Sequence, residues 1–377
     1  MRSQVVAGLL SGTSMDGVDV CLCRIDPDPD WGCELLAFET YPYPADLRLT
    51  LSQDTQGSLE KVALWQRQLG EVFADALETL LQTHQGLVER VDLIGSHGQT
   101  LYHRHRMTTL QLGEAALLAA RLGCPVVSDF RVNDIAVGGC GAPLVPYVDH
   151  RLFSRLGRPT LVVNLGGIAN FTALPGRPDT LAGVQGFDCG PGNMVLDQLT
   201  RLITRGAQSH DVDGQLAAQG QVQPEVLARL MAHPFVSAPP PKSAGREQFG
   251  AVFMQELVNL CSPGSFTAWV NLLATATRFT AAALYQNYCQ FIQPQFAVTE
   301  VIVSGGGVHN HTLMAEIQAC FGAIPVVTSD TYGVPSDAKE AMAFAILAAE
   351  RMAGRPTNVP AVTGASRPVQ LGKITEL

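Results

Sequence analysis

Short apolar runs alternate with longer helical patterns along the chain, which is typical of an α/β protein. Residues 5–10 are apolar, and residues 18–25 alternate between apolar and polar positions, so two strands are expected. Asp16-Gly17 between them favours a hairpin turn, because both turn positions prefer residues that accept positive φ. Farther on, apolar residues recur at helical spacing from Leu59 to Leu80, after Gly57-Ser58, and predict a helix with one apolar face.

The opening pattern recurs in the second half of the chain. A β-branched run at 160–165 leads into Gly166-Gly167, and a second strand-like run follows to Ala173. This predicts a second hairpin able to present backbone N–H groups to an anion. A simple turn would explain either hairpin alone, but it makes the occurrence of the pair a coincidence.

Three further strand-like runs end in polar or glycine-rich segments. Residues 91–95 predict a buried strand that places 96–100 at its carboxyl end, where ligands bind in open α/β sheets. Residues 125–128 precede Arg131, whose guanidinium suits an anion or a carboxylate; the alternative is a surface ion pair with Asp129 or Asp134. Residues 299–304 precede Gly305-Gly306-Gly307, after which a helix is expected from about Thr312.

Residues 186–193 combine a carboxylate with glycines and a proline. Asp188 ends a strand-like segment, and Pro191 fits the first turn of a helix at 193–203. A carboxylate near a helix N-terminus favours its ionised form and suits a general base. The alternative role for Asp188 is that of a helix N-cap.

Composition narrows the function classes. The chain has 377 residues, of which 46% are hydrophobic and 16% charged, and this length suits two domains. The net charge is −9 with no basic block, which disfavours nucleic-acid binding. The nine cysteines are scattered without a Cys-x-x-Cys pair, so reduced thiols in a cytoplasmic enzyme fit best. No apolar stretch is long enough for a membrane span.

Other polar residues add candidate chemistry. Small residues between Gly12 and Gly17 could bind an anion, and Asp16 and Asp19 could hold Mg²⁺ through water. His97 could donate to a sugar hydroxyl or a carboxylate, or be a loop histidine satisfied by backbone. Glu340 lies in the first turn of the last long helix, with Ser336 as the expected N-cap.

Several separated motifs resemble the anhydro-N-acetylmuramic acid kinase family. Ser11-Gly-Thr-Ser-Met-Asp-Gly-Val-Asp19 looks like its N-terminal signature, and Phe187-Asp-Cys-Gly-Pro-Gly-Asn193 looks like its catalytic-aspartate signature, with Cys189 where Thr is expected. The segment 241–247 is also similar to the family, and the resemblance runs from Gly8 to about Ile374. The chain has no Gly-x-x-x-x-Gly-Lys-[Ser/Thr] loop and no Gly-x-Ser-x-Gly elbow, which excludes a P-loop kinase and disfavours an α/β-hydrolase.

The resemblance implies two actin-like (ribonuclease H-like) α/β domains, with mixed sheets flanked by helices and an interdomain ATP and substrate cleft. The expected domains are 1–134 plus 338–377, and 135–337. The family likeness makes Asp188 the catalytic base and His97, Gln99, Arg131 and Glu340 the substrate-binding residues, with Arg131 near the lactyl carboxylate. The expected ATP-binding residues are Gly12, Thr13, Ser14, Met15, Asp16, Gly17, Val18, Asp19, Asn164, Gly166, Gly167, Gly305, Gly306 and Gly307.

The implied activity is ATP-dependent phosphorylation of 1,6-anhydro-N-acetylmuramic acid in the cytoplasm, with Mg²⁺ as the metal. The 1,6-anhydro ring opens by hydrolysis, and the products are N-acetylmuramic acid 6-phosphate and ADP, in cell-wall recycling. The expected partners are the amino sugar and ATP, with a homodimer as a family expectation and neither nucleic acid nor membrane. Two alternatives stay open: a kinase of the same fold for another sugar, and a non-catalytic ATP-dependent binding protein.

Overall fold

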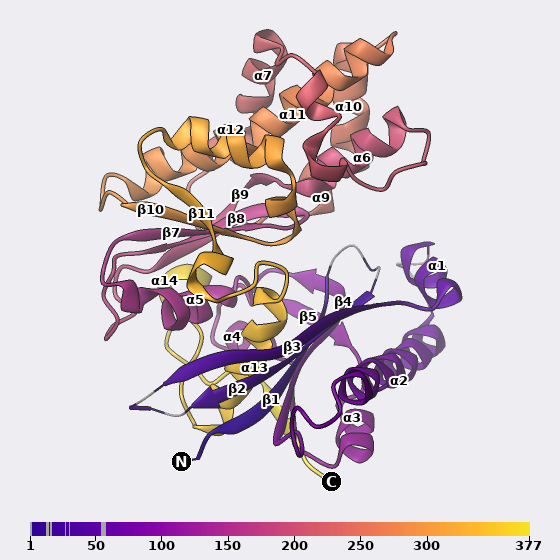
Figure 1. The fold of residues 1–377 in the computed structure, drawn as a ribbon, viewed down its shortest axis with the longest axis vertical. Helices are drawn as coiled ribbons and strands as arrows, with labels where there is room; N and C mark the ends of the chain where they lie inside the picture. The colour runs from indigo at the N-terminus through magenta and orange to yellow at the C-terminus, as the bar shows by residue number, and fades with distance from the viewer. Residues whose placement is uncertain (1, 13–14, 16, 27, 30, 54–57) are drawn as a thin grey trace. The chain divides into compact units, whose positions relative to one another are not determined.

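Two compact units make up the protein. The computed structural model describes residues 2–12, 15, 17–26, 28–29, 31–53 and 58–377. Unit 1 is Met1–Val148 with Ala338–Leu377, and unit 2 is Asp149–Asp337. Each contains one mixed sheet flanked by helices, which confirms the predicted α/β class (Figure 1).

The sheet of unit 1 has the strand order β12-β6-β4-β1-β2-β3, with β5 paired to β4. β2 runs antiparallel to both of its neighbours, β1 and β3, whereas β1 pairs with β4, and β4 with β6, in parallel. The strands are β1 (Gln4–Ser11), β2 (Gly17–Asp26), β3 (Gly32–Pro42), β4 (Leu93–Arg104), β5 (Thr108–Leu112), β6 (Val126–Ser128) and β12 (Lys373–Thr375).

The sheet of unit 2 repeats this arrangement in the order β11-β10-β7-β8-β9. Again three antiparallel strands come first, and the first of them pairs in parallel with the fourth, which pairs in parallel with the fifth. The strands are β7 (Thr160–Leu165), β8 (Ile168–Leu174), β9 (Gln185–Pro191), β10 (Glu300–Ser304) and β11 (Val326–Thr328). In each sheet the first two strands of the unit, β1–β2 and β7–β8, pair antiparallel, as the two predicted hairpins require.

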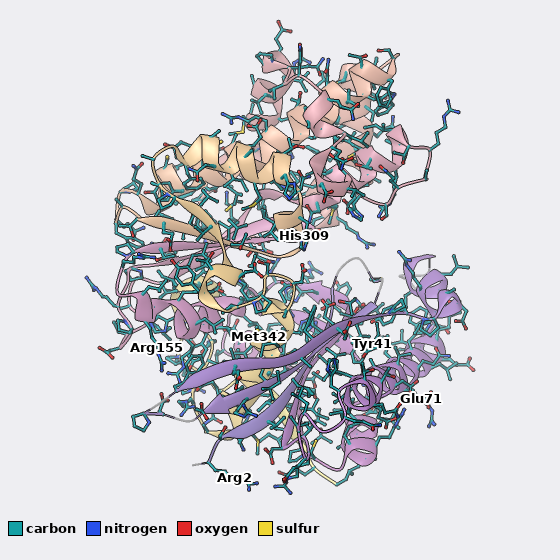
Figure 2. The ribbon with its side chains drawn as sticks, in the orientation of Figure 1. Arg2, Tyr41, Glu71, Arg155, His309 and Met342 are labelled. Atoms are coloured by element: carbon teal, nitrogen blue, oxygen red, sulfur yellow. The ribbon has the colours of Figure 1, made fainter. Side chains whose placement is uncertain are left out.

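Helices cover both faces of the sheet in unit 1. Trp65, Leu69 and Phe73 of α2 pack in one core with residues of β1 and β2. On the opposite face α13 lies so close that a Cβ added to Gly8 or Gly95 would come within 2.1 Å of its backbone, and Met342 of α13 is fully buried (Figure 2). The helices are α1 (Ala45–Gln53), α2 (Leu59–Thr83), α3 (Ala115–Leu122), α4 (Val132–Ala136), α13 (Lys339–Met352) and α14 (Pro360–Thr363), and the chain passes from unit 1 to unit 2 within α5 (Val145–Phe153).

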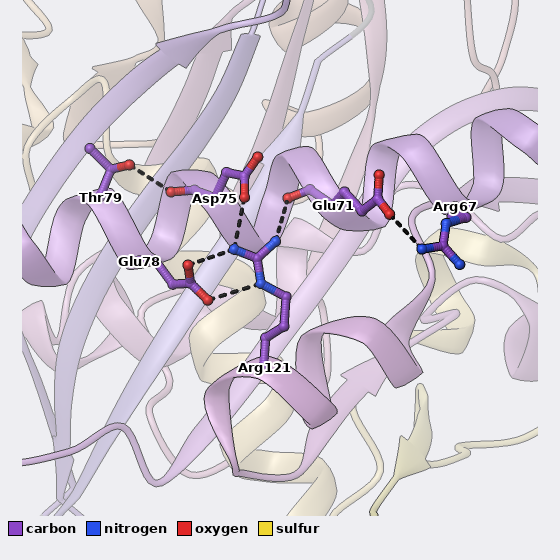
Figure 3. A network of polar contacts seen from close by, with 6 residues as sticks. All are labelled: Arg67, Glu71, Asp75, Glu78, Thr79 and Arg121. Atoms are coloured by element: carbon purple, nitrogen blue, oxygen red, sulfur yellow. Dashed lines mark hydrogen bonds and ion pairs between the residues drawn. The ribbon is translucent and has the colours of Figure 1, made fainter.

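A charged contact ties α3 to α2 in unit 1. The Arg121 guanidinium lies 2.5 Å from Glu78 Oε2 and 2.8 Å from Asp75 Oδ1, and donates a bond of 3.4 Å to the carbonyl of Glu71 (Figure 3). These acceptors raise the pKa of Arg121, so its charge is permanent. Ser58 caps α2, as the sequence predicted for the start of this helix.

In unit 2 the apolar side of the sheet packs against α6, α11 and α12. The long helix α11 continues directly into a π-helical segment, η4. The helices are α6 (Asn193–Ile203), α7 (Pro224–Met231), α8 (Pro234–Ser237), α9 (Arg246–Phe249), α10 (Ala251–Cys261), α11 (Phe266–Asn287) and α12 (His311–Phe321), with short helical segments η1 (Ser154–Leu156), η2 (Val212–Gly214), η3 (Ala217–Gln219), η4 (Tyr288–Ile292), η5 (Gly306–His309) and η6 (Ser329–Tyr332). No helix in the described ranges has the length and hydropathy to cross a membrane.

The first junction between the units differs from the expected domain limit of 134/135. Residues 135–148 belong to unit 1, because their loop is bonded to the C-terminal segment of that unit. Cys140 N donates to the carbonyl of Thr363, and Gly141 N donates to the Asp134 carboxylate, which also binds Thr363.

Two local expectations in unit 1 are wrong. Gly17 does not lie at the tip of a two-residue turn with positive φ; it begins β2 and pairs with Pro42 of β3. The polar run 96–100 is not beyond the end of its strand, since β4 continues through it to Arg104. Antiparallel pairing with β5 extends β4 past the point where the sequence pattern ends.

Candidate functional site

The turn between β7 and β8 is fastened to the start of α6. The carbonyl of Gly166 accepts from Asn193 N at 2.8 Å, and that of Gly167 accepts from Gly192 N at 3.0 Å and Met194 N at 3.1 Å. A Cβ on Gly192 would lie 2.3 Å from the Gly166 oxygen, so only glycine fits there. The hairpin tip is therefore a rigid glycine turn, which suits an anion-binding backbone.

The triple-glycine turn lies against the same hairpin. Ser304 pairs with Asn164, and Gly305 has φ of 85°. A Cβ on Gly305 would approach Asn164 Oδ1 to 2.6 Å. The structure thus brings Asn164, Gly166, Gly167 and Gly305–Gly307 to the carboxyl ends of two neighbouring parallel strands, while their role in ATP binding stays a prediction.

Ser336 does not cap the last long helix as expected; the N-cap of α13 is Ala338. Instead the Ser336 hydroxyl is hydrogen-bonded to the Asp330 carboxylate, and the Ser336 carbonyl accepts from Gly305 N at 3.0 Å. Hydrogen bonds from Ser336 and Thr328 lower the pKa of Asp330 even though burial opposes this. Ser336 therefore supports the triple-glycine turn.

Asp188 lies in β9, half-buried, and pairs with Asn170 of β8. Its Oδ2 accepts from Ser243 Oγ at 2.9 Å and from Ala244 N at 2.7 Å. The N-cap alternative for Asp188 is wrong, since Gly192 is the N-cap of α6. Pro191 likewise ends β9 and does not open the helix. Sequence reasoning missed Ser243, because it lies 55 residues away along the chain.

Lys242 lies beside Asp188 in an aromatic environment. Its ammonium donates to the carbonyls of Phe235 and Val236 at 2.9 and 3.1 Å. It also lies 4.9, 5.5 and 5.7 Å from the ring centroids of Phe235, Phe291 and Phe187. Burial lowers the pKa of Lys242 to about 8, although the nearby Asp188 carboxylate acts to raise it.

In unit 1, the first hairpin carries part of the predicted ATP site. Thr13, Ser14 and Asp16 lie outside the described residues, whereas Gly12, Met15, Gly17, Val18 and Asp19 are described. Met15 is buried with φ of 54°, and its N–H donates to the carbonyl of Gly12 at 3.3 Å. Asp19 Oδ1 accepts from Thr40 Oγ1 at 2.7 Å.

Gln99 supports this hairpin from β4. Its Oε1 lies 2.7 Å from Ser11 Oγ and 3.2 Å from the Tyr43 hydroxyl, and its Nε2 donates to the carbonyl of Gly12 at 3.2 Å. The side chain is 1% exposed. The expected direct contact of Gln99 with substrate is therefore not favoured; its amide is engaged in holding the hairpin.

His97 is bonded to Arg131 inside unit 1. Arg131 Nε donates to His97 Nε2 at 3.1 Å, while His97 Nδ1 lies 3.0 Å from the Gly98 carbonyl and so carries the proton. Burial, and then the charge of Arg131, lower the pKa of His97 well below its usual value. The expected donation from His97 to substrate is not favoured, since both ring nitrogens have partners within the protein.

Arg131 is linked through His97 to Phe344 of α13, the helix that carries Glu340. Arg131 also donates to the carbonyl of Gly141 at 2.9 Å, and the His97 ring lies 4.6 Å from that of Phe344. Glu340 precedes Phe344 by one helical turn, so both project from the same face of α13. His97, Arg131 and Glu340 thus belong to one part of unit 1.

The sequence suggests Asp134 only as an ion-pair partner of Arg131. In the structure it is a buried carboxylate that accepts hydrogen bonds from three other residues. Its Oδ1 accepts from Asn358 Nδ2 at 2.8 Å and Thr363 Oγ1 at 2.7 Å, and its Oδ2 accepts from Gly141 N at 2.8 Å. It thereby fixes the loop whose carbonyl holds Arg131.

Within the described ranges of the chain, no group of three or more His, Cys, Asp or Glu side chains is arranged to hold a metal ion. The expected water-mediated ligand, Asp16, lies outside those ranges.

The chain is similar to known proteins over almost its whole length. The family described as "Anhydro-N-acetylmuramic acid kinase" matches residues 4–376. The protein of that name from Caldanaerobacter subterraneus subsp. tengcongensis is 40% identical, covering 99% of this chain and 97% of the relative. Its namesake from Salinibacter ruber is 41% identical, covering 99% and 96%. Among solved structures, the activator of the 2-hydroxyisocaproyl-CoA dehydratase from Clostridium difficile with bound ADPNP is 13% identical with a TM-score of 0.45, covering 91% of this chain and 94% of that one.

The family match spans both hairpins, the Asp188 strand and the triple-glycine turn, and two relatives near 40% identity cover almost the full chain. The chain therefore belongs to the anhydro-N-acetylmuramic acid kinase family.

Proposed function

We propose that the protein phosphorylates 1,6-anhydro-N-acetylmuramic acid with ATP and opens its anhydro ring, giving N-acetylmuramic acid 6-phosphate and ADP. Family membership supports the kinase activity and the substrate. The single observation that carries the mechanism is the placement of Asp188, whose carboxylate is held at Oδ2 by Ser243 and Ala244. This is a positioned, half-buried carboxylate of the kind that serves as a general base.

In the proposed reaction, Asp188 takes a proton from a water molecule as the water oxygen bonds to the anomeric carbon. The bond from that carbon to O6 breaks, and its electron pair stays on O6. The O6 oxygen then bonds to the γ-phosphorus of ATP, and the bond from the γ-phosphorus to the bridging oxygen breaks to release ADP. One base thus serves both hydrolysis and transfer, while the remaining catalysis is positioning and charge stabilisation.

The phosphate-binding role falls to the two glycine hairpins. Gly12 to Asp19 of unit 1 and Gly166-Gly167 of unit 2 supply backbone N–H groups, and Gly305–Gly307 lie against the adenosine. Support comes from the rigid attachment of the Gly166-Gly167 turn to α6 and from the space left by the missing Cβ at Gly305.

Mg²⁺ is proposed as the metal, and the donor set of the first hairpin fits it. Mg²⁺ prefers oxygen ligands, keeps several waters, and needs only one or two carboxylates besides the phosphates. Asp19, already oriented by Thr40, and Asp16 would hold the ion through water. Such an ion neutralises charge that develops on the phosphates.

On the sugar side, we propose that Arg131 binds the lactyl carboxylate and that Glu340 binds a sugar hydroxyl. His97 fixes the Arg131 guanidinium, and Gln99 fixes the hairpin. We propose that the reaction takes place in the cytoplasm, since it consumes ATP. The homodimer stays a prediction, which analytical ultracentrifugation tests by measuring the mass of the protein in solution.

Release of ADP with 1,6-anhydro-N-acetylmuramic acid tests the function. We expect turnover by the wild-type protein, and a loss of roughly a hundredfold or more in Asp188→Asn, because the amide cannot accept the proton. Asp179→Asn, at an exposed turn of unit 2, is the matched control and should keep full activity.

The alternatives give different results. Faster turnover on glucose or N-acetylglucosamine would indicate another sugar kinase, and ATP binding without sugar-dependent turnover would indicate a binding protein. An Asp188→Asn variant as active as the wild type would remove Asp188 from the mechanism.

A further inference from the structure

We infer that Lys242, Ser243 and Ala244 form a clamp that positions Asp188 and sets the pH range in which this carboxylate acts as a base. The residues of this Asp188 clamp are positioning residues, acting through Asp188. The inference rests on the proposed function, since it assigns the clamp to the base of that reaction.

The clamp binds both the side chain and the backbone of Asp188. Ser243 Oγ and Ala244 N donate to Oδ2 at 2.9 and 2.7 Å, and Asp188 N donates to the carbonyl of Lys242 at 3.3 Å. Three consecutive residues are thus hydrogen-bonded to one residue more than 50 positions earlier in the chain. Two donors on one carboxylate oxygen fix its orientation, which a general base requires.

Lys242 fastens the clamp to its surroundings. Its ammonium donates to two carbonyls of α8 and lies near the rings of Phe187, Phe235 and Phe291. Phe187 directly precedes Asp188 in β9, so the cation joins α8, the clamp and the strand that carries the base. A desolvated cation beside aromatic rings contributes more than an exposed one.

The charges around Asp188 favour its ionised form. From the clamp Lys242 faces it with a positive charge, and on β9 its neighbour Cys189 is a buried thiol whose pKa is raised well above its usual value, so it stays neutral. The next helix, α9, begins with the exposed residues Arg246 and Glu247. Hydrogen bonds donated to a carboxylate stabilise its charged form and keep its pKa low.

Ser243→Ala tests the clamp, because it removes the hydroxyl that donates to Oδ2 and leaves the backbone donor, Ala244 N, in place. We expect the acidic limb of the profile of kcat/KM against pH to move up by about one pH unit, since a hydrogen bond to a charged group has an effect of this size. At the optimal pH, kcat should fall about tenfold through looser orientation of the base. Ser243→Thr keeps the hydroxyl and should restore the limb, whereas the weak donor in Ser243→Cys should give an intermediate shift.

Control variants distinguish a role of the Asp188 clamp from the role of Asp188 in the proposed reaction. Ser209→Ala, an exposed serine of unit 2, should leave the profile unchanged, and melting temperatures report whether each variant folds. If Asp188→Asn is inactive but Ser243→Ala, Ser243→Cys and Ser243→Thr all keep the wild-type limb, the clamp is overturned and the function stands. If Asp188→Asn is fully active, the proposed function fails first.

Discussion

A half-buried histidine that stays neutral makes unit 1 sensitive to acid. His103 of β4 lies 3.1 Å from Thr109 Oγ1, and burial, with the charge of Arg131 next, lowers its pKa to about 4. The unfolded chain binds a proton at this residue below about pH 6.5, and the folded chain does not until about pH 4. Since the unfolded state then binds more protons, stability falls as the pH drops through this window.

We therefore expect the free energy of unfolding to decrease between about pH 6.5 and about pH 4, and to decrease less in His103→Gln. Urea unfolding at a series of pH values measures both slopes. His311→Gln, at an exposed histidine of α12, is the control and should keep the wild-type slope. Equal slopes in His103→Gln and the wild type would show that His103 does not carry the effect.

At the same scale, the sequence indicated Asp188 but not what holds it. A carboxylate next to glycines and a proline is a local signal, whereas the bonds from Ser243 and Ala244 depend on how β9 and the 239–245 loop come together. His97 and Gln99 show the same limit. The sequence predicts substrate contacts for both side chains, whereas the structure shows contacts within the protein, from Arg131 to His97 and from Gln99 to the Gly12 carbonyl.

Among the elements, the turn after β10 has a glycine at which positive φ and a close contact occur together. Gly305 has φ of 85°, and an added Cβ would lie 2.6 Å from Asn164 Oδ1. We expect Gly305→Ala to raise the KM for ATP about tenfold or more, because the turn must shift from the β7–β8 hairpin. ADP release at varied ATP concentration measures this.

Gly322 offers a matched control for backbone strain. It also has positive φ, 62°, at the end of α12, but an added Cβ would meet nothing within 4 Å. Gly322→Ala should lower the melting temperature slightly and leave the KM for ATP unchanged. If both variants raise this KM alike, strain and not the contact with Asn164 explains the effect.

Strands and helices with strong periodicity were predicted well, and element ends less so. α2 and the β7–β8 hairpin follow from the spacing of apolar residues, whose side chains lie in the buried cores. β4 is longer than predicted because its second half pairs with β5, a contact that no local pattern reports. The start of α13 was also misplaced, because Ser336 binds Asp330 instead of capping the helix.

On the scale of the molecule, a single buried carboxylate joins distant parts of unit 1. Asp134 is 0% exposed and accepts bonds from Gly141, Asn358 and Thr363. We expect Asp134→Ala to destabilise the protein by about 3 kcal/mol, because three buried donors lose a charged acceptor. Urea unfolding measures this, and hydrogen exchange should rise in residues 357–366.

Asp46→Ala, at an exposed position of α1, is the control for Asp134→Ala and should change stability little. If Asp134→Ala unfolds at the wild-type urea concentration and keeps slow exchange in 357–366, Asp134 does not hold the C-terminal segment in place.

The helix that completes unit 1 comes late in the chain. α13 covers the face of β1 and β4 at Gly8 and Gly95, yet all of unit 2 separates it from these strands in sequence. During synthesis on the ribosome, unit 2 is made in full while that face still lacks its helix. Unit 1 is therefore begun first and finished last, and its nascent sheet is the surface on which a chaperone would act during translation.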